Sequence, residues 1–397
     1  GIFLSHPIDI LEIYFSCLQL GKIPIILPLD ISSNDLQTII DSYQIKFIIS
    51  EWVRKKQITK ISGASFFYNQ ELSSGYGGCG ATEFSSIISN IDSTQSMHLT
   101  SGSTGTPKLI PLSFNNFINS VAQWDDEIKF SESDKYIQCL PLNHIAGLSI
   151  IIRSQLKGFE AILMNKFNSS SINFEIDNGA TLISLIPSML KRLLDNRCGK
   201  PFPKHLKAII VSGDSVSRAV MEQALKAKAP IYKSYGMTET CSGICGFWLE
   251  KHPEMIDSVG KSFNKTNIKI HDSSIHIKGP SVTSASNEKG VFKTADIGYF
   301  KNRFLFISGR SDDIIISGGE NISLSQIKNI LLKHPDISDT YLSSTPDDEY
   351  GHLITAYIEL KKELSENEIL NYCKSLLSKK QLPQRIQIVD KINHDLF

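Results

Sequence analysis

Thr100-Ser101-Gly102-Ser103-Thr104-Gly105-Thr106-Pro107-Lys108 is the most informative part of this chain. It brings hydroxyl side chains, two glycines and a lysine together in nine residues. Upstream, Met97-His98-Leu99 is typical of the end of a short strand, and downstream the apolar spacing of Phe114, Phe117 and Val121 predicts a helix. We therefore expect a loop that follows a strand and precedes a helix.

The composition of this loop suits a polyphosphate ligand. Glycines let backbone N–H groups turn inward, while the hydroxyls and Lys108 supply further donors. It is not a Walker loop, because that pattern needs Gly-Lys-Ser/Thr and here Pro107 precedes Lys108. Ser, Thr, Gly and Pro are also ordinary residues of a polar surface turn, so the loop alone leaves both interpretations open.

Three further strings follow in order, and with the loop they resemble the signatures of the adenylate-forming superfamily: acyl-CoA synthetases, luciferases and the adenylation domains of nonribosomal synthetases. They are Ser234-Tyr235-Gly236-Met237-Thr238-Glu239, Thr294-Ala295-Asp296-Ile297-Gly298, and Gly309-Arg310-Ser311-Asp312-Asp313 running into Ser317-Gly318-Gly319-Glu320-Asn321. Four motifs in the expected order make chance a poor explanation. The resemblance implies a ligase that uses ATP and Mg²⁺ to activate a small-molecule carboxylate, with CoA as co-substrate.

Composition excludes several other classes. Lys+Arg 41 against Asp+Glu 41 leaves no net charge, which argues against a nucleic-acid partner. No apolar run is long enough to span a bilayer, so we expect no membrane insertion. The 7 cysteines, an odd number, do not resemble a disulfide framework, and Cys241 and Cys245 lack the two further ligands of a metal site. We expect reduced thiols and a cytoplasmic protein; the sequence leaves open whether it is a homo-oligomer.

Apolar runs alternate with helical patterns along most of the chain, which predicts an α/β fold with mainly parallel sheets and crossover helices. Strands are expected near 2–4, 23–27, 46–50, 136–140, 161–164, 182–186, 208–211 and 231–232, and helices over 8–20, 36–43, 147–156, from 187, and over 217–227. Gly102, Gly213 and Tyr235 each follow a predicted strand, where ligands of open α/β sheets bind. Gly75, Gly77 and Gly80 match a dinucleotide fingerprint without its strand and helix, so we predict a loop there.

The pattern changes near Ser311. A helix over 324–333, strands over 339–342 and 353–360, a helix opened by the capping box Ser365–Glu368 and a last strand over 385–389 indicate a small α+β unit. We predict a large N-terminal domain over 1–310 and a small mobile C-terminal domain over 311–397. The resemblance implies that Asp312 is the hinge between adenylation and thioester formation, and that Gly318 and Gly319 line the pantetheine channel.

The resemblance also implies which residues hold ATP. Those expected to contact its phosphates are Thr100, Ser101, Gly102, Ser103, Thr104, Gly105 and Lys108. Tyr235, next to Gly236, corresponds to the aromatic shelf for adenine. Thr238 lies beside the α-phosphate and Glu239 binds Mg²⁺, a hard cation that phosphate oxygens otherwise hold. Thr238, Glu239 and His144 are the residues expected to act in catalysis.

The remaining nucleotide contacts come from three more positions. The turn Ser212-Gly213-Asp214 corresponds to the backbone on the other adenine face. Asp296 matches the carboxylate that accepts hydrogen bonds from the ribose hydroxyls, although the usual Thr-Gly-Asp is Thr-Ala-Asp here. Arg310 matches the arginine that also reaches the ribose. A lone Asp or Arg is more often a surface charge, so these assignments depend on the motifs.

The acyl substrate is indicated by Pro141-Leu142-Asn143-His144-Ile145-Ala146-Gly147-Leu148-Ser149-Ile150-Ile151-Ile152-Arg153. This string resembles one branch, the o-succinylbenzoate–CoA ligases of menaquinone biosynthesis, with Asn143 at a position where an aromatic residue is usual. The resemblance implies that His144 flanks the acyl pocket and that Arg153 pairs the second carboxylate of the substrate. A monocarboxylate would leave an inward arginine unpaired, which is costly. The alternative is that Arg153 reaches solvent at a helix end.

Other functions remain open at this point. A fatty-acid or aryl-acid ligase would keep every motif and change only the acyl pocket. An adenylation domain of a carrier-protein assembly line is another alternative. The superfamily's catalytic lysine, in a C-terminal Gly-Lys, should directly follow Phe397, and Lys391 comes too early to replace it. Gly1 runs straight into the predicted strand 2–4. We therefore expect truncation at both ends; the alternative is a non-catalytic adenylate-binding module.

Overall fold

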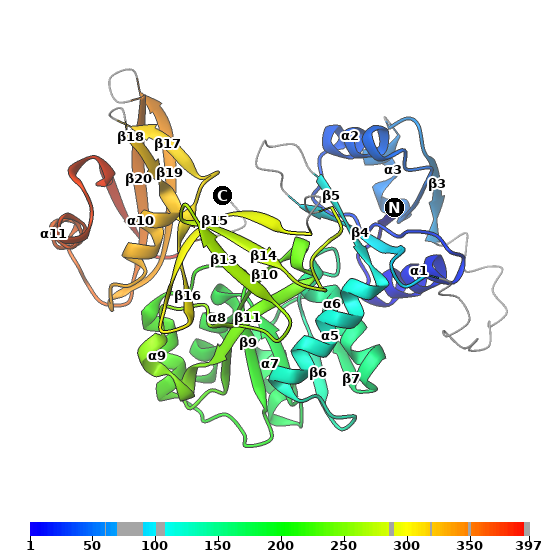
Figure 1. The fold of residues 1–397 in the computed structure, drawn as a ribbon, viewed down its shortest axis with the longest axis horizontal. Coiled ribbons are helices and arrows are strands. Elements are labelled where there is room, and N and C mark those ends of the chain that lie inside the picture. Colours follow the sequence, from blue (N-terminus) through cyan, green and yellow to red (C-terminus); the bar gives the residue numbers. More distant parts are fainter. Residues whose placement is uncertain are drawn as a thin grey trace. The chain divides into compact units, whose positions relative to one another are not determined.

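The computed structural model describes residues 1–59, 61–69, 90–100, 108–285, 290–317, 320–347 and 351–392. Figure 1 shows the order of the elements along the chain. The fold is α/β, as predicted. It divides into two compact units: Gly1–Asn168 with Gly236–Gly243 and Gly279–Phe292, and Ser169–Tyr235 with Ile244–Lys278 and Lys293–Phe397. The domain boundary at residue 310 stays a prediction.

The first unit begins with a small parallel sheet in the order β1-β2-β3. Its helix α2 is opened by Ser32, whose side chain accepts a hydrogen bond from the backbone N–H of Asp35. Leu36, Ile39 and Ile40 recur with helical spacing and are buried in the core of this sheet. The elements are β1 (Ile2–Phe3), α1 (Pro7–Gln19), α2 (Ser33–Tyr43), β2 (Phe47–Ser50), η1 (Trp52–Arg54), α3 (Lys55–Ile58) and β3 (Ser65–Tyr68).

The predicted phosphate loop joins the strands of an antiparallel hairpin. β4 (Thr94–Thr100) pairs with β5 (Lys108–Ser113), so that Thr100 faces Lys108 across the ladder. Helix α5 (Phe114–Ile128) begins only after β5, with a capping box between Ser113 and Asn116. The expected strand and helix are confirmed, but β5 was missed. Its proline, Pro111, is unusual in a strand and hides the strand pattern.

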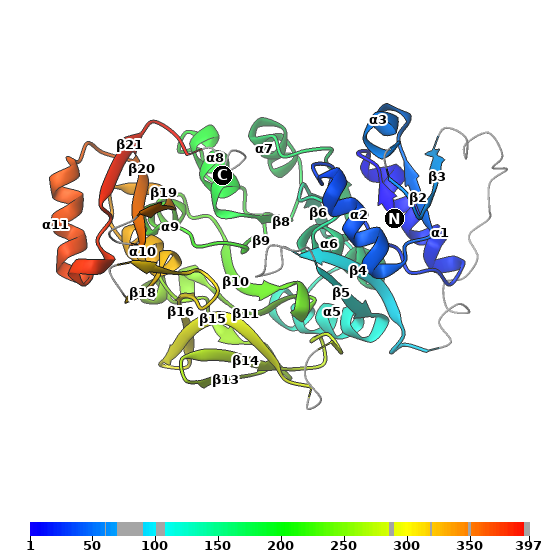
Figure 2. The ribbon, with the colours of Figure 1, turned by 90° about the horizontal axis from the view of Figure 1, so that it is seen from above.

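A second core of the first unit lies between helices α1, α5 and α6. The rest of this part is β6 (Lys135–Gln138), α6 (Ile145–Lys157), β7 (Glu160–Leu163), with β6 and β7 parallel, and the turn η3 (Thr238–Thr240). The buried side chains that meet here include Ile10, Tyr14, Leu18, Phe117, Val121, Leu148, Ile151, Ile152 and Cys241. This core fixes α6, which contains Arg153 and begins directly after His144; these are the two predicted acyl-pocket residues. Figure 2 shows α5 and α6 together with the β4–β5 hairpin.

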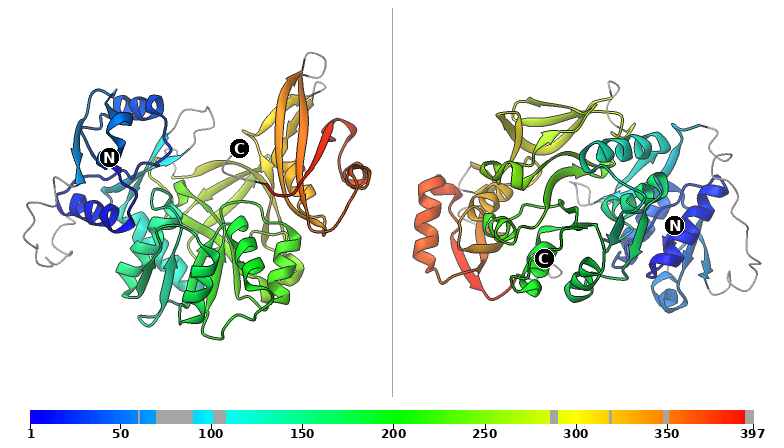
Figure 3. Two further views of the ribbon diagram at one scale, coloured as in Figure 1. Left: turned by 180° about the vertical axis from the view of Figure 1, so that it is seen from behind. Right: turned by 90° about the horizontal axis from the view of Figure 1, so that it is seen from below.

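The second unit contains three parallel strands, β8, β9 and β10. Green helices lie over green strands in this part of the chain when it is seen from behind (Figure 3). The elements are α7 (Ser169–Asp177), β8 (Leu182–Leu185), α8 (Pro187–Arg197), β9 (Ala208–Val211), α9 (Arg218–Lys226), β10 (Ile231–Met237), β11 (Ser242–Trp248), η4 (Leu249–Lys251), η5 (Pro253–Met255) and β12 (Lys261–Ser262). One expectation was wrong: Tyr235 and Gly236 lie inside β10, because the strand continues through Met237.

The described C-terminal part of the second unit contains mainly antiparallel strand pairs, one parallel pair formed by β20 and β21, and two helices. Its elements are β13 (Asn267–His271), β14 (Ser274–Lys278), β15 (Phe292–Lys301), β16 (Phe304–Arg310), β17 (Ile314–Ser317), β18 (Glu320–Ser323), α10 (Leu324–Leu331), β19 (Ile337–Asp347), β20 (Gly351–Leu360), α11 (Glu366–Leu376), η6 (Lys379–Gln381) and β21 (Arg385–Val389). The predicted capping box of Ser365 and Glu368 is present. The helices and strands predicted for this region are confirmed, with β19 extending beyond its predicted range.

Two general features follow from the described residues. The cysteines within them are all free thiols, as expected. Within the described ranges, no helix combines the length and the apolar character needed to cross a bilayer.

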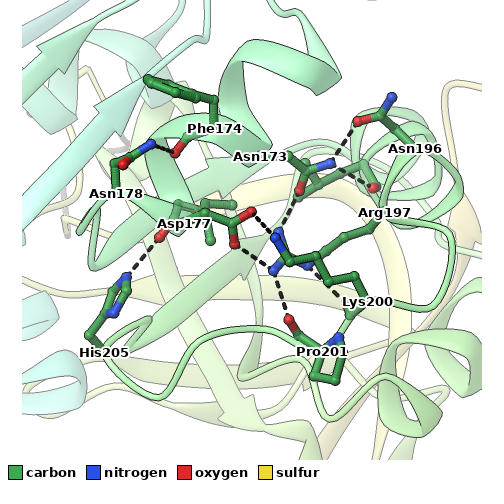
Figure 4. A network of polar contacts seen from close by, with 11 residues as sticks. Asn173, Phe174, Asp177, Asn178, Asn196, Arg197, Lys200, Pro201 and His205 are labelled. Carbon is green, nitrogen blue, oxygen red and sulfur yellow. Dashed lines mark hydrogen bonds and ion pairs between the residues drawn. The ribbon is translucent and has the colours of Figure 1, made fainter.

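Arg197 holds the end of α8 against α7 (Figure 4). Its guanidinium donates to the side-chain oxygens of Asn173 at 2.9 Å and Asp177 at 2.8 Å. It also donates to the backbone oxygens of Lys200 at 3.1 Å and Pro201 at 2.7 Å. The Arg197 side chain is 3% exposed, whereas Lys200, which pairs with the same Asp177, is 63% exposed. The buried guanidinium is therefore hydrogen-bonded to four acceptors and fixes the helix–loop junction.

We predict that Arg197→Met destabilises the second unit by about 1–3 kcal/mol, because the buried Asn173 side-chain oxygen loses its donor. Lys200→Ala is the matched control, since it removes the exposed partner of the same carboxylate and should cost about 0–1 kcal/mol. Urea unfolding followed by circular dichroism gives both values. Equal effects of the two substitutions would contradict the role assigned to Arg197.

Candidate active site

The carboxylate of Asp296 binds residues from two other motifs, Tyr235 and Arg310, in the second unit. The Tyr235 hydroxyl of β10 donates to Asp296 Oδ2 at 2.5 Å, and Arg310 Nη1 donates to Asp296 Oδ1 at 3.1 Å. Asp296 on β15 and Arg310 on β16 face each other in the antiparallel register, so the ladder sets their pairing. The Asp296 side chain is 9% exposed. The structure thus brings together the predicted adenine and ribose residues.

Arg310 continues this chain of contacts to the predicted hinge. Its Nε and Nη2 atoms donate to the two carboxylate oxygens of Asp312 at 2.8 and 2.6 Å. This two-pronged hydrogen bond, with the nearby Asp296, raises the pKa of Arg310 above its ordinary value. Burial raises the pKa of Tyr235 well above its ordinary value, and Asp296 adds to the effect. Tyr235 is therefore a neutral hydrogen-bond donor at neutral pH.

Asp214 has a partner that the sequence did not suggest. Ser212 and Gly213 follow β9, as expected, and the Ser212 N–H donates to the backbone oxygen of Leu185 at 3.2 Å. The Asp214 carboxylate, however, binds Lys328 Nζ of α10 at 2.9 Å. The neighbouring Ser215 hydroxyl is 2.5 Å from Asn329 Oδ1. This turn is consequently tied to α10, a contact between segments more than 100 residues apart that no local pattern reveals.

The turn that carries Thr238 and Glu239 lies in the first unit. Gly236 precedes it, and a Cβ at that position would lie 2.0 Å from the backbone oxygen of Ser242, so only glycine fits. Cys241 and Ser242 have φ values of 53° and 95°, a backbone conformation uncommon for residues other than glycine. Glu239 is half-buried within this sharp reversal between β10 and β11.

Three residues that the sequence reading missed hold this turn in place. The Thr283 N–H donates to the backbone oxygen of Glu239 at 2.8 Å. The Thr283 hydroxyl donates to the backbone oxygen of Pro111 at 2.6 Å. The turn therefore lies against β5, the strand that begins with Lys108.

Ser120 of α5 donates to the Cys241 backbone oxygen at 2.6 Å. Asn116 donates to the backbone oxygens of Pro280 and Val282. None of these residues belongs to a motif, so only their contacts identify them.

Magnesium was predicted to bind at Glu239, and the residues present are compatible with it. Within the described ranges, no cluster of three or more His, Cys, Asp or Glu side chains can hold a metal alone. Mg²⁺ is commonly held by one or two carboxylates together with substrate phosphates, which Glu239 beside the phosphate-loop hairpin would allow. A dedicated protein cage is not required.

Arg153 is buried and does not reach solvent, which excludes the alternative raised from its position in the helix. It is 2% exposed. Its Nη2 atom donates to the Ser242 hydroxyl at 2.8 Å, and its guanidinium lies 4.5 Å from the centre of the Trp124 ring. Its Nε has no hydrogen-bond partner among the described residues, and no carboxylate there forms an ion pair with it. Burial lowers the pKa of Arg153. A buried cation of this kind calls for an anionic ligand.

His144 is the N-cap residue of α6 and is exposed. Since nine residues separate it from Arg153, the two lie about 13 Å apart along the helix axis. Inside the same unit, His98 of β4 is 4% exposed and its Nε2 is 2.9 Å from the Ser96 hydroxyl. Burial, with a smaller contribution from His144, lowers the pKa of His98 to about 4. His98 is thus a neutral residue beside the predicted acyl pocket.

Several predicted residues lie outside the described part of the chain: Ser101, Gly102, Ser103, Thr104 and Gly105 of the phosphate loop, and Gly318 and Gly319 of the predicted CoA channel. The glycine pattern at Gly75, Gly77 and Gly80 does as well. Thr100 and Lys108, at the two ends of the phosphate loop, are paired in the β4–β5 ladder, and the Thr100 hydroxyl is 3.4 Å from the Lys108 backbone oxygen.

A family model and several known proteins match this chain. A family model described as AMP-binding enzyme matches residues 1–284. The 2-succinylbenzoate–CoA ligase of Bacillus subtilis (strain 168) is 33% identical over 326 residues, which cover 76% of this chain and 66% of that ligase. The 2-succinylbenzoate–CoA ligase of Oceanobacillus iheyensis is 30% identical over an alignment of 418 residues, covering 99% of this chain and 85% of that ligase.

Solved structures of the Bacillus subtilis synthetase also match this chain. The o-succinylbenzoate CoA synthetase of Bacillus subtilis in complex with its acyl-adenylate intermediate matches with a TM-score of 0.85 and 28% identity. The match covers 99% of this chain and 84% of that one. The same synthetase in complex with ATP and magnesium ion matches with a TM-score of 0.85 and 28% identity over 99% of this chain and 86% of that one.

We predict that the folded state becomes less stable as the pH falls from about 6.5 to 4 because of His98. The folded-state pKa of about 4 lies below the ordinary 6.5, so the unfolded chain binds the proton first. The stabilisation is complete above pH 6.5, and roughly 3 kcal/mol is lost by pH 4. Unfolding free energies of His98→Met should show a flatter pH dependence in this window. His252→Gln is the control, and an unchanged slope in His98→Met would refute the assignment.

Proposed function

Because this chain belongs to the AMP-binding enzyme family, we propose that it is an AMP-forming acid–CoA ligase that acts on 2-succinylbenzoate in menaquinone biosynthesis. The relatives named above are 2-succinylbenzoate–CoA ligases, and the matching structures of the Bacillus subtilis synthetase contain its acyl-adenylate, or ATP with magnesium. The substrates are small and polar, so we assign the reaction to the cytoplasm.

The proposed reaction has two steps. A carboxylate oxygen of the acid attacks the α-phosphorus of ATP in line with the leaving pyrophosphate, which gives an acyl-adenylate. The CoA thiolate then attacks the acyl carbon, and AMP leaves with the electron pair of the broken C–O bond. Both steps bring anions together, so positioning and electrostatic stabilisation carry most of the catalysis.

We assign the nucleotide to the residues gathered around Asp296. Each carboxylate oxygen of Asp296 already accepts one hydrogen bond, from Tyr235 or from Arg310, and retains a lone pair for a ribose hydroxyl. Tyr235 offers its ring face to adenine. In the first unit, Thr100, Lys108 and Thr238 would contact the phosphates. Glu239 would hold Mg²⁺, which neutralises phosphate charge when bound.

The observation that carries the substrate assignment is Arg153, which is buried against Trp124 and Ser242 without a carboxylate partner among the described residues. A dicarboxylate substrate such as 2-succinylbenzoate would supply the missing anion through the carboxylate that is not activated. A fatty or aryl monocarboxylate would leave the cation uncompensated. Ser242 is three residues beyond Glu239, so the arginine lies next to the turn that we assign to Mg²⁺. His144, the N-cap residue at the other end of the pocket helix, would flank the acyl pocket.

We predict that Arg153→Ala lowers kcat/KM for 2-succinylbenzoate by about 100-fold, the cost of losing a buried charged hydrogen bond. Pyrophosphate release with ATP, Mg²⁺ and CoA is measured for the full-length protein over a panel of mono- and dicarboxylic acids. Arg153→Lys keeps the positive charge and should recover part of the activity lost in Arg153→Ala. Such recovery would show that the loss reflects substrate binding by the charge and not misfolding. Lys157→Ala, at the exposed end of the same helix, is the control and should have little effect. An unchanged kcat/KM in Arg153→Ala would refute the dicarboxylate assignment. So would a wild-type protein that releases pyrophosphate only with monocarboxylic acids.

We predict that Asp296→Ala weakens AMP binding by about 10- to 100-fold, since the ribose loses its acceptor. Tyr235→Phe retains the ring and removes only the hydroxyl, so it should change the affinity no more than a few-fold. Isothermal titration of the chain with AMP measures both without any turnover. If Tyr235→Phe proved as harmful as Asp296→Ala, the hydroxyl rather than the carboxylate would be the nucleotide contact.

A further inference from the structure

A cavity of about 450 Å³ lies within the second unit and is lined by none of the residues assigned above. One wall is formed by helices α8 and α9 and the other by strands β19 and β20, which are labelled in Figure 2. Its volume is in the range of sites for small organic ligands. Val220 of α9 and Leu360 of β20 give it an apolar lining.

The two walls are already linked by a half-buried polar bridge. Lys191 of α8 forms an ion pair with Glu359 of β20, and its Nζ is 3.3 Å from the Ser338 hydroxyl of β19. Ser338 in turn donates to the Glu359 backbone oxygen at 3.0 Å. Since Glu359 compensates the charge of Lys191, this lysine holds the walls together and is not available to a ligand.

Two other lysines of the lining lack such compensation. Lys226, in the last turn of α9, and Lys361, directly after β20, are exposed and have no ion-pair partner among the described residues. They come from opposite walls of the cavity. Asp195 is the one lining carboxylate within the described residues, and it accepts a hydrogen bond from Gln223 at 3.3 Å. An anion bound between the lysines would therefore be attracted by two charges and repelled by one.

We propose that this cavity binds an organic phosphate monoester, a ligand with a dianionic head and an apolar body. Lysines act as point charges toward phosphate, and a monoester carries close to two negative charges at neutral pH. The two uncompensated ammonium groups match that head, and Val220 and Leu360 match the body. The ligand would contact both walls, so its binding would stabilise the packing of β19 and β20 against α8 and α9. None of the lining residues belongs to the nucleotide or acid site assigned above. The walls belong to the large domain predicted over 1–310 and to the mobile domain predicted over 311–397, so the ligand would hold these two parts of the second unit together.

The test uses phenyl phosphate as the probe, titrated calorimetrically into the wild-type chain and its variants. Lys226→Ala with Lys361→Ala should weaken binding by about tenfold or more, whereas Asp195→Asn should tighten it several-fold by removing the repulsion. Lys269→Ala with Lys278→Ala removes two exposed lysines from the β13–β14 hairpin of the same unit and is the matched control. Hydrogen exchange with and without the probe should show protection in α9 and β19.

The opposite responses of the lysine and aspartate variants are decisive, because a purely structural role would not predict tightening in Asp195→Asn. Equal affinities in all variants would mean that the probe binds elsewhere, and the proposal would be overturned. Absence of binding to the wild type at millimolar phenyl phosphate would overturn it too. Equal weakening by the control pair would indicate only nonspecific attraction to positive charge, which also contradicts a site.

Discussion

One carboxylate, that of Asp296, unites the parts of the chain that the motifs place far apart. It accepts hydrogen bonds from Tyr235 on β10 and from Arg310 on β16, and Arg310 also binds Asp312. A buried carboxylate needs such partners, because an unpaired charge in a low-dielectric interior is strongly destabilising. The antiparallel register of β15 and β16 sets one of these contacts, and the extension of β10 through Met237 supplies the other. The nucleotide assignment thus depends on strand geometry as much as on residue type.

Two buried arginines illustrate the difference between stabilising and functional charge. Arg197 donates to Asn173, Asp177 and two backbone oxygens, and so its burial requires nothing further from the molecule. Arg153 has the hydroxyls of Ser242 and Tyr136 and the ring of Trp124 as neighbours, and its Nε has no partner among the described residues. An incompletely compensated cation costs stability, and such costs are concentrated at functional sites. We therefore attach the substrate proposal to Arg153 and only a structural role to Arg197.

The turn of Glu239 shows how a catalytic position is held by residues outside the motifs. Thr283 ties its backbone to β5, and Ser120 ties its exit to α5. Hydrogen bonds therefore connect the β4–β5 hairpin, the helix after it and the turn of the predicted metal ligand within the first unit. Functional side chains need supporting hydrogen bonds of this kind to keep their geometry. In the second unit, the bond between Asp214 and Lys328 ties the turn after β9 to α10 in a comparable way.

The sequence by itself determined the family, the α/β class, most helices and strands, and the identity of the motif residues, because capping boxes, hydrophobic spacing and motif order are local properties. Only the tertiary structure decided that β5 separates the phosphate loop from its helix, that Tyr235 lies within a strand, that Asp214 pairs with Lys328 and that Arg153 is buried. The bonds of Tyr235 to Asp296, of Arg153 to Ser242 and of Asp214 to Lys328 join residues 61, 89 and 114 positions apart. Local sequence cannot specify such contacts, because they form only when distant segments fold against each other.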